Sequence, residues 1–591
     1  MKLLRLKITD PAGFRSLPCG FEHHFRSEWS LQDELAKPEG FAPFVCAGPN
    51  GSGKSNLLEA LAAIFFQLEV QRVRRSFLPD ALLNDEVDST PCAYELEYWI
   101  KLPLDALPEQ ERYAHVRVSK TAQASPQMHW LNPENFAALS EGLAADGLCS
   151  ERERDFLLPE YVLGYSSGEN EILSLPFFKM RFVQYDEYWN CLKEQLPYSG
   201  RPETRLAYLD SGFSQAILLC NLLFQDEATL KPFREDVGVE RLNEFRIVIR
   251  RSIAATAEVA SAFGNGHPAL TTNSETGARR INLMQLLEAG PDSAVKFDPI
   301  VTRLKRCATC WFIDEANDTL VLDYWVNEAT KQAFCENFDD TFYQSPLALF
   351  QAFQVLLTLN LYSVSDALKA DLYRSTSHYV SETVPTLASD ERIMRFKFVR
   401  FSKQGVAQPM MLKEMSDGEH QLLHSLGLCL LFRNTNSLFL LDEPETHFNP
   451  DWRANFISRL RQCLPGTGNV RQEMLITTHT PFLISDSKPD KVLVFAKDKT
   501  SGAVSISHPD YNTFGASINK ITMSTFDKRE TIGGYVQAIL DDLRARFEHG
   551  AENPDTLIDE IHQQLGDSVE KLLLINAILD KAGQRDGEAQ G

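Results

Sequence analysis

The sequence predicts an α/β fold that is interrupted by a large, mainly helical insertion and followed by a helical C-terminal segment. Strand-like and helix-like patterns alternate over residues 1–175 and again over 395–510, as they do in α/β domains. Residues 176–394 read mainly as helices separated by Pro and Gly loops, without a sustained heptad pattern. The insertion is therefore expected to be a folded lobe and not a coiled-coil arm. Residues 511–591 again read mostly as helices.

Composition limits the possible classes of protein. The 591 residues are 43% hydrophobic and carry a formal charge of −22, which indicates a globular chain and disfavours nonspecific binding to polyanions. A local basic surface is still compatible with that total. Eleven scattered cysteines and a start without an apolar core predict a cytoplasmic protein with free thiols. The most apolar helical stretch, Leu347–Leu361, is shorter than the ~20 residues that cross a bilayer, so no membrane segment is expected.

Individual strands are predicted from their patterns. Residues 1–8 alternate apolar and charged side chains, which predicts an edge strand with one buried face. Two further runs, Tyr94–Leu102 and Tyr113–Val118, are strand-like and joined by a turn that contains Pro. Within the insertion, Thr309–Phe312 and Leu320–Val326 predict a hairpin.

A glycine-rich loop follows the apolar strand Phe44–Ala47 and precedes a helical pattern, Ser55–Leu68. The loop, Gly48-Pro-Asn-Gly-Ser-Gly-Lys-Ser, matches G-x-x-x-x-G-K-[ST] in full. Its glycines allow backbone N–H groups to point at phosphates, the lysine adds a compact charge, and the serine hydroxyl can bind Mg²⁺. The sequence therefore predicts ATP and Mg²⁺ as ligands. The residues expected at ATP are Asn50, Gly51, Ser52, Gly53, Lys54, Ser55 and Asn56.

Two later strands end in residues that suit phosphate chemistry. The apolar run Leu438–Leu441 leads into Asp442 and Glu443. Asp442 can hold Mg²⁺, and Glu443 can accept the proton of an attacking water. A second strand, Met474–Thr478, ends at His479, which can hydrogen-bond a γ-phosphate.

A third element, Ser416-Asp-Gly-Glu, precedes the helical run His420–Arg433. Its serine and glycine amide lie at a helix N-terminus, which favours an anion. The 26 residues from Ser416 to Asp442 leave room for one helix, a turn and a strand. We therefore expect Ser416, Gly418 and Glu419 to contact nucleotide.

Together, in this order, the four elements resemble the ABC ATPase superfamily. The run GPNGSGKSNLLEAL is most similar to its RecF, SMC and OLD-like branch. The resemblance implies a head-to-tail homodimer, or a higher even oligomer, in which Ser416 and Gly418 complete the partner's site. Asp417 departs from the pattern because many relatives carry Gly there. The glutamine that usually links Mg²⁺ to the insertion has no clear counterpart, and Gln184 is a weak candidate.

Other runs are similar to the PtuA-like ATPase subunits of Septu and retron antiphage systems, namely FRSLPCGFEHHF, LGYSSGENEILSLPF, TFGASIN and LGDSVEKLLL. This resemblance implies a separate HNH nuclease as a partner, and in retrons a reverse transcriptase with its RNA–DNA product. Two alternatives remain open. One is a RecF/SMC-like DNA repair ATPase that binds DNA directly, and the other is a scaffold in which ATP only locks the dimer.

Three motifs imitate functional sites. Tyr165-Ser-Ser-Gly-Glu resembles a second copy of the Ser416-Asp-Gly-Glu element, which is the signature motif of ABC ATPases. It is interpreted as a loop that enters the insertion. Asp314 and Glu315 imitate Asp442 and Glu443, the Walker B acids at the end of a strand, but their segment continues into a hairpin. Cys307 and Cys310 have the spacing of zinc ligands, but there is no second pair of cysteines. The C-terminus shows no Toprim nuclease pattern, so no nuclease site is expected in this chain.

The helices from about Thr531 to Lys581 carry apolar residues at helical spacing. The first group is Leu557, Ile561 and Leu565, and the second is Val569, Leu572 and Ile575. Two interpretations are open, packing onto the ATPase core or docking of the nuclease. Because the segment follows the last core strand, docking is preferred for part of it.

Overall fold

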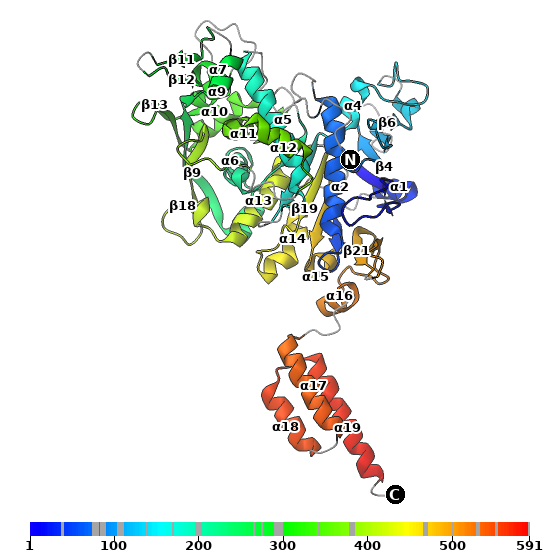
Figure 1. Cartoon of the computed structure of the whole chain (residues 1–591). Helices are drawn as coiled ribbons and strands as arrows, with labels where there is room; N and C mark the ends of the chain where they lie inside the picture. The colour runs from blue at the N-terminus through cyan, green and yellow to red at the C-terminus, as the bar shows by residue number, and fades with distance from the viewer. Residues whose placement is uncertain are drawn as a thin grey trace. The chain divides into compact units, whose positions relative to one another are not determined.

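The computed structural model confirms a mixed α/β fold and divides the chain into two compact units, Met1–Phe514 and Gly515–Gly591 (Figure 1). Each unit is described by itself. The structure describes all residues except 37–40, 74–81, 83–89, 103–111, 137–138, 168–170, 195–203, 264–265, 274–275, 289–298, 341–342, 345, 378–383, 465–470, 499, 527–531, 550–552 and 589–591.

A seven-stranded sheet forms the centre of the first unit. Its order is β22 (Val504–Ser507), β21 (Val492–Lys497), β3 (Phe44–Ala47), β20 (Glu473–Thr478), β19 (Ser437–Asp442), β7 (Tyr161–Ser166) and β8 (Leu206–Tyr208). The ladders from β21 to β8 are all parallel, and only β22 pairs antiparallel. The carboxyl ends of β3, β20, β19 and β7 therefore meet at one edge, where α/β sheets bind their ligands.

A second, antiparallel sheet has the order β2 (Glu22–His24), β1 (Lys2–Ile8), β4 (Tyr94–Lys101), β5 (Tyr113–Lys120) and β6 (Gln127–Trp130). The expectation that residues 1–8 form an edge strand is wrong, because β1 pairs with β2 on one side and β4 on the other. Arg5, which suggested a solvent face, is paired with Glu22, Glu95 and Glu97 on the neighbouring strands.

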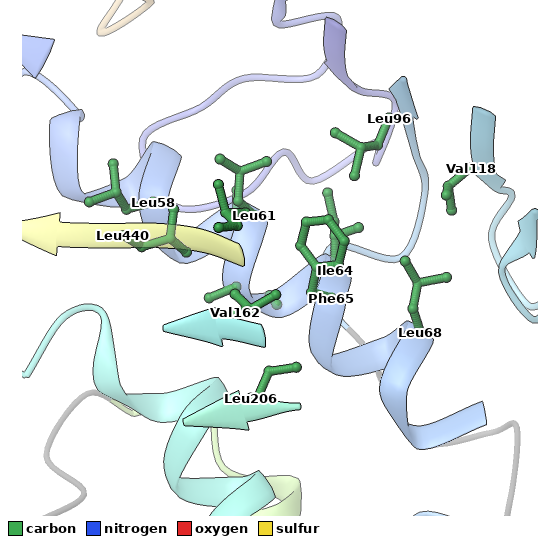
Figure 2. Packing of buried hydrophobic residues seen from close by; sticks show 14 of the residues in the cluster. Leu58, Leu61, Ile64, Phe65, Leu68, Leu96, Val118, Val162, Leu206 and Leu440 are labelled. Carbon is green, nitrogen blue, oxygen red and sulfur yellow. The ribbon is translucent and has the colours of Figure 1, made fainter. Parts of the chain in front are cut away.

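The helix after the phosphate loop, α2 (Lys54–Arg72), is buried on nearly all sides between these two sheets. Figure 2 shows Leu58, Leu61 and Phe65 of α2 among apolar side chains from both sheets. The labelled neighbours are Leu96, Val118, Val162, Leu206 and Leu440. Burial of each such side chain contributes about 1.5–3 kcal/mol, so the position of α2, and of the loop before it, is fixed by packing.

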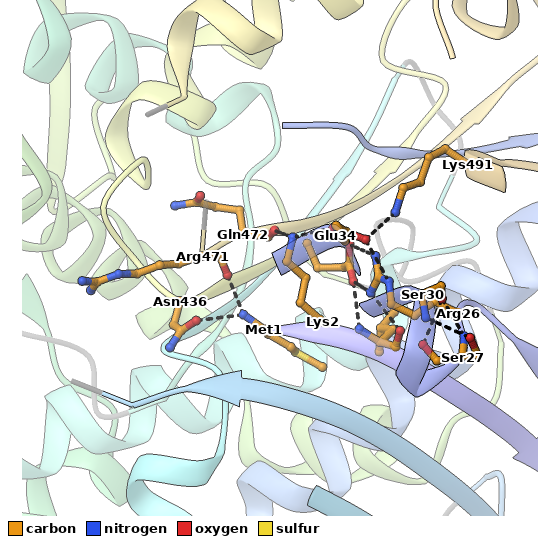
Figure 3. Close-up of polar contacts among 12 residues, drawn as sticks. Met1, Lys2, Arg26, Ser27, Ser30, Glu34, Asn436, Arg471, Gln472 and Lys491 are labelled. Carbon is orange, nitrogen blue, oxygen red and sulfur yellow. Dashed lines mark hydrogen bonds and ion pairs between the residues drawn. The ribbon is translucent and has the colours of Figure 1, made fainter. Parts of the chain in front are cut away.

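Polar contacts fasten the start of the chain to the central sheet (Figure 3). Arg26 lies 2.5 Å from the carboxylate of Glu473 on β20. Glu34 accepts from Lys491 at 2.9 Å and lies 3.4 Å from Lys2. The nearby cations hold the pKa of Glu34 below its usual range despite burial. A buried group of charges survives in a protein only when it is paired in this way.

A third sheet joins three strands of the insertion to two strands that follow it in the sequence, and only its hairpin was predicted. The order is β13 (Cys310–Asp314), β14 (Thr319–Trp325), β9 (Val239–Arg250), β17 (Met394–Lys403) and β18 (Met410–Met411). The predicted hairpin is confirmed as β13 and β14. The reading as mainly helical missed β9, and β17 pairs with β9 and not with the strands of the central sheet.

The remaining elements are short strands and helices. Small sheets pair β10 (Ser252–Ala254), β12 (Arg279–Asn282) and β11 (Leu270–Thr272), and β15 (Asp339–Asp340) with β16 (Tyr343–Gln344). Around the central sheet lie α1 (Glu28–Ala36), α4 (Glu151–Leu157), α13 (Asp417–Leu431), α14 (Pro450–Cys463) and α15 (Pro481–Ser485). The insertion adds α5 (Ser174–Lys193), α6 (Ser214–Phe224), α7 (Ala257–Ala262), α8 (Met284–Leu287), α9 (Ile300–Cys307), α10 (Glu328–Asn337), α11 (Pro346–Thr358) and α12 (Asp366–Arg374).

The second unit consists of α16 (Ile518–Thr525), α17 (Gly534–His549), α18 (Pro554–Gln564) and α19 (Val569–Glu588). The last three helices share an apolar core of their own, made of Leu540, Leu543, Leu557, Ile561, Leu565, Leu574, Ile575 and Ile578. Four of the predicted docking residues, Leu557, Ile561, Leu565 and Ile575, are therefore core residues of this bundle. The exposed apolar face of α19 consists of Val569, Leu572, Leu573 and Leu579.

Among the described residues, no single helix is long and apolar enough to cross a membrane. The pair Pro346–Ser363 and Asp366–Arg374 meets that test jointly, with a bend of 106°.

Candidate functional site

The phosphate loop adopts a backbone that requires glycine at two positions. Gly48 has a φ of 146° and Gly53 a φ of 100°, which L side chains rarely adopt. A Cβ atom on Gly48 would lie 2.5 Å from the carbonyl oxygen of Phe495, and one on Gly53 would lie 2.8 Å from Ser16 Oγ. The motif is therefore held in its shape by β21 on one side and by the segment around Ser16 on the other.

Lys54 is the first residue of α2 and lies against the inside of this loop. Its ammonium donates to the carbonyl oxygens of Gly48 and Pro49, at 3.0 and 3.1 Å. The side chain is buried, and burial lowers the pKa of Lys54 from its ordinary value. An ammonium placed in such a loop is positioned to bind β- and γ-phosphates.

Three hydroxyl groups converge on the buried carboxylate of Asp442, at the end of β19. Ser55 Oγ donates to Oδ1 at 2.8 Å, Thr477 Oγ1 donates to the same oxygen at 2.6 Å, and Ser166 Oγ lies 3.4 Å from Oδ2. Burial raises the pKa of Asp442. A bound divalent cation would favour the ionised form.

The donor set of Ser55 and Asp442 fits Mg²⁺. Magnesium prefers hard oxygen ligands and usually takes one or two from the protein, with water and phosphate oxygens completing its shell. Within the described residues there is no group of three or more His, Cys, Asp or Glu side chains that could hold a metal without a nucleotide. Ser55 and Asp442 could supply the protein's share of a magnesium shell that water and phosphate oxygens complete.

Glu443 follows Asp442 and points toward the end of β20. Its Oε1 lies 2.8 Å from Nε2 of His479, and its backbone N–H donates to Thr477 Oγ1 at 3.0 Å. Glu443 has a φ of 50°, a strained backbone conformation for a residue with a side chain. The hydrogen bond from His479 lowers the pKa of Glu443. An ionised, half-buried carboxylate is the form that can accept a proton from water.

The loop after Glu443 is fastened to β20 by a buried acid. Glu445 is fully enclosed and accepts a short hydrogen bond from Thr478 Oγ1, one residue before His479. Burial raises the pKa of Glu445 to about 7. Glu445 therefore ties the turn that carries Glu443 to the strand that carries its histidine.

The structure gives the predicted signature residues local partners. Ser416 caps α13 in a reciprocal capping box with Glu419, whose carboxylate is also paired with Lys403. Gly418 lies so close to the loop after Glu443 that a Cβ atom would be 2.7 Å from the His447 carbonyl oxygen. In the described part of the chain, no hydrogen bond or ion pair joins Ser416, Gly418 or Glu419 to the phosphate loop.

Sequence reasoning missed Ser166 and Ser167. Their segment was interpreted as a loop, but β7 pairs with β19 so that Ser166 stands beside Asp442. Ser167 N–H donates to the Asp442 carbonyl at 3.1 Å, and its hydroxyl lies 2.8 Å from Thr446 Oγ1. The sequence did contain one indication, because a strand followed by small polar residues can pair with the strand that ends at Asp442.

Gln184, the weak candidate for the glutamine that links Mg²⁺ to the insertion, has other partners in this structure. It is buried in α5, where its amide donates to Thr204 Oγ1 and to the Leu206 carbonyl on β8. Both hydrogen bonds of the amide nitrogen therefore hold α5 against β8 and the segment that precedes it.

Asn56, which was predicted to contact ATP, is hydrogen-bonded to other protein side chains in this structure. Its carbonyl accepts from Ser16 Oγ at 2.6 Å, and its amide lies 3.5 Å from Glu59. Glu59 in turn binds Arg15 through two oxygens, at 2.8 and 3.2 Å. This group positions the N-terminal Arg15–Ser16 turn against the phosphate loop, a contact that the sequence did not reveal.

Comparison with known proteins adds to this geometry. Residues 318–485 match the AAA_21 family, described as an AAA domain, putative AbiEii toxin, type IV TA system. The matched segment contains Ser416, Asp442, Glu443 and His479, whereas the phosphate loop precedes it.

Protein ea59 of Escherichia phage lambda is 24% identical over 155 residues, which is 26% of this chain and 28% of that relative. This chain thus spans well under two thirds of the relative's length. Among solved structures, the chain is similar to an Smc head bound to the C-winged helix domain of ScpA, with 10% identity, coverage of 86% and 97% of the two chains, and a TM-score of 0.30. The SMC head domain from Thermotoga maritima gives 10% identity, coverage of 86% and 100%, and a TM-score of 0.27. Scores this low support no further conclusion.

Proposed function

We propose that this chain binds ATP with Mg²⁺ and hydrolyses it at a site shared between two copies. The observation that supports hydrolysis is the arrangement at the carboxyl edge of the central sheet. There, Ser55 at the start of α2 pairs with Asp442 at the end of β19, and Glu443 pairs with His479, which follows the adjacent strand β20. A site that only binds nucleotide needs the first pair, whereas a positioned base is required for turnover.

The residues divide the reaction between them. Lys54 and the loop N–H groups hold the phosphates. Ser55 and Asp442 would hold a magnesium ion, which would neutralise charge on the phosphate oxygens. Glu443 accepts the proton of the attacking water. His479 holds Glu443 in place and can reach the γ-phosphate, since it lies at the end of β20 beside β3.

The site is proposed to be completed by a second copy in a head-to-tail dimer. Ser416 and Gly418 lie at the N-terminus of α13, which favours an anion. Within its own copy, Ser416 bonds Glu419, and Gly418 lies against the His447 carbonyl. A helix N-terminus that does not contact its own phosphate loop is available to the nucleotide of the partner copy.

For the biological role, we propose an ATPase subunit of an antiphage defence complex that regulates or scaffolds a separate HNH nuclease. The resemblance to PtuA-like subunits supports this role, as does the second unit, whose α19 exposes Val569, Leu572, Leu573 and Leu579. In a retron system the complex would also include a reverse transcriptase with its RNA–DNA product.

The test is to purify the chain alone and together with the products of its neighbouring genes. Phosphate release that depends on Mg²⁺ and is lost in Lys54→Ala is the expected result for ATPase function. Co-purification of an HNH protein is the expected result for the defence role. A chain that binds ATP without turnover, alone or in the complex, contradicts the first proposal, and a complex without a nuclease contradicts the second.

A further inference from the structure

The sheet of the insertion has an open edge. β13 is the outer strand of the order β13-β14-β9-β17-β18, and Figure 1 shows it at the periphery of the lobe. In the described part of the chain, no strand pairs with β13 on the side away from β14. Backbone N–H and C=O groups on that side therefore face outward and can pair with another strand.

This edge is also apolar. Trp311, Phe312 and Ile313 are 48%, 43% and 44% exposed, and Trp325 at the end of β14 is 69% exposed. Natural edge strands are usually protected by Lys, Pro or a bulge. β13, with the sequence Cys-Trp-Phe-Ile-Asp, contains no Lys or Pro, and its register with β14 is regular. Contiguous exposed apolar side chains on an unprotected edge are typical of an interaction surface.

We propose that β13 pairs antiparallel with β13 of a second copy of this chain, so that the two five-stranded sheets become continuous. The strand is complementary to itself about a two-fold axis at Phe312. In that register Phe312 faces Phe312, Trp311 faces Ile313, and Asp314 faces the neutral Cys310. No like charges are opposed, and aromatic and branched side chains form the cross-strand pairs that stabilise sheets most.

The charges that flank the strand are already paired within their own copy. Lys305 lies 4.3 Å from the centre of the Trp311 ring and 2.6 Å from Glu288, and Arg251 lies 2.8 Å from Glu315. The net charge of −22 opposes association mainly at long range, and salt screens that repulsion over about 10 Å. Pairing through β13 uses no nucleotide, so it is separate from the head-to-tail interface. Both interfaces together would produce an even oligomer larger than a dimer.

The first experiment measures molar mass by light scattering without nucleotide, on the full chain and two matched variants. Phe312→Lys places a charge at the proposed axis, and Phe514→Lys changes a phenylalanine of similar exposure, 52%, outside this sheet. We expect the wild type and Phe514→Lys to be dimers and Phe312→Lys to dissociate with a dissociation constant at least roughly tenfold higher. A wild type that is monomeric, or a Phe312→Lys protein that stays dimeric, overturns the proposal.

Measurements with ATP distinguish the β13 interface from the proposed head-to-tail interface. In the background Glu443→Gln, with ATP and Mg²⁺, Phe312→Lys is expected to form a dimer through the heads, while the protein with an intact β13 forms a larger even oligomer. Failure of Phe312→Lys to dimerise with ATP counts against the proposed head-to-tail site. An oligomer of the same size with and without Phe312→Lys counts against β13.

A cross-link tests the register. Residues directly opposite in antiparallel strands have Cβ atoms about 4.5–5.5 Å apart, close to what a disulfide spans. Asp314→Cys is therefore expected to form an intermolecular disulfide with native Cys310, identified by mass spectrometry, under mild oxidation. The double variant Asp314→Cys, Cys310→Ser is the control and should not form it. Cross-links of the introduced thiol only to cysteines other than Cys310 would overturn the two-fold register.

Discussion

The ring of His479 lies 2.8 Å from the carboxylate of Glu443, although the two residues end neighbouring strands and are separated by a long helix in the sequence. The contact fixes the carboxylate beside Asp442 and keeps it ionised, since the hydrogen bond from His479 lowers the pKa of Glu443. The contact therefore links Glu443, the proposed base for the attacking water, to His479, which is proposed to contact the γ-phosphate.

Replacing the base tests that assignment directly. Glu443→Gln keeps the size and one oxygen of the side chain but removes its basicity, so we expect ATP binding to remain and turnover to fall roughly 10²–10⁴-fold. The variant should accumulate as an ATP-bound dimer. Turnover and nucleotide affinity are measured separately, with Lys54→Ala as the variant that loses binding. A Glu443→Gln protein that hydrolyses ATP at the normal rate would show that the base is another residue.

Composite sites predict complementation between two inactive proteins. Ser416→Arg should bind ATP but not hydrolyse it, because the arginine blocks the partner's nucleotide, and Lys54→Ala should fail to bind. In a mixed dimer one of the two sites is built from intact halves. We therefore expect an equal mixture to recover up to about a quarter of wild-type activity, given random pairing of the subunits and independent sites. Absence of recovery at every mixing ratio would contradict the head-to-tail arrangement.

Ser166 provides a test of the metal site. Its hydroxyl lies 3.4 Å from Asp442, whereas the hydroxyl of Ser167 bonds Thr446. Ser166→Ala is expected to raise the Mg²⁺ concentration needed for tight nucleotide binding by about 3- to 10-fold, the effect of one weakened hydrogen bond. Ser167→Ala is the matched control and should leave that concentration unchanged. Equal effects of the two substitutions would assign both serines to packing alone.

Candidate site residues could be predicted where one short segment contains a recognisable motif. They were harder to predict where the site depends on pairing between segments that are distant in the sequence. The phosphate loop, Asp442 and Glu443 follow from residue type and spacing, and the strands that carry them lie where the sequence predicts them. The position of Ser166 depends on the pairing of β7 with β19, which are far apart in sequence. The edge-strand prediction for residues 1–8 failed for a related reason. Alternating charge indicates a solvent face unless the neighbouring strands supply carboxylates, as they do for Arg5.

The buried acid Glu445 predicts a dependence of stability on pH. Its pKa is raised from 4.5 to about 7, so the folded protein retains a proton that the unfolded chain releases in this interval. The sign follows from linkage: this group's contribution is greatest below pH 4.5 and is lost as the pH rises toward and beyond 7. Glu445→Gln stays neutral and can still accept from Thr478. We expect it to exceed the wild type in stability by on the order of 3 kcal/mol at about pH 8, and by less than about 1 kcal/mol near pH 5.

Thermal or urea unfolding at about pH 5 and about pH 8 measures this difference. The comparison between the two proteins cancels the titration of the other carboxylates, including Glu443, which also acts on Glu445. Parallel pH profiles for the wild type and Glu445→Gln would show that Glu445 has an ordinary pKa.

The proposal that the second unit docks a nuclease can be tested by truncation, and the boundary between the two units determines where the chain should be truncated. Truncation near Asp555 would remove α18 and α19 and leave α17 without the apolar core that the three helices share, so its effects would not be specific. A cut after Phe514 follows the boundary between the two units. We expect the shortened protein to retain Mg²⁺-dependent ATPase activity and to lose the HNH nuclease in a pull-down.

Single substitutions distinguish the loss of the exposed apolar face of α19 from unfolding of the whole second unit. Leu572→Glu changes a residue that is 60% exposed on α19, while Leu557→Glu changes a core residue of the same bundle. The first should abolish nuclease retention without lowering the melting temperature, and the second should unfold the bundle. If Leu572→Glu and the protein cut after Phe514 both retain the nuclease, docking lies on the first unit, with the insertion as the next candidate. An insoluble shortened protein would instead show that the helices pack onto the ATPase core, because an independent unit can be removed without exposing buried apolar surface.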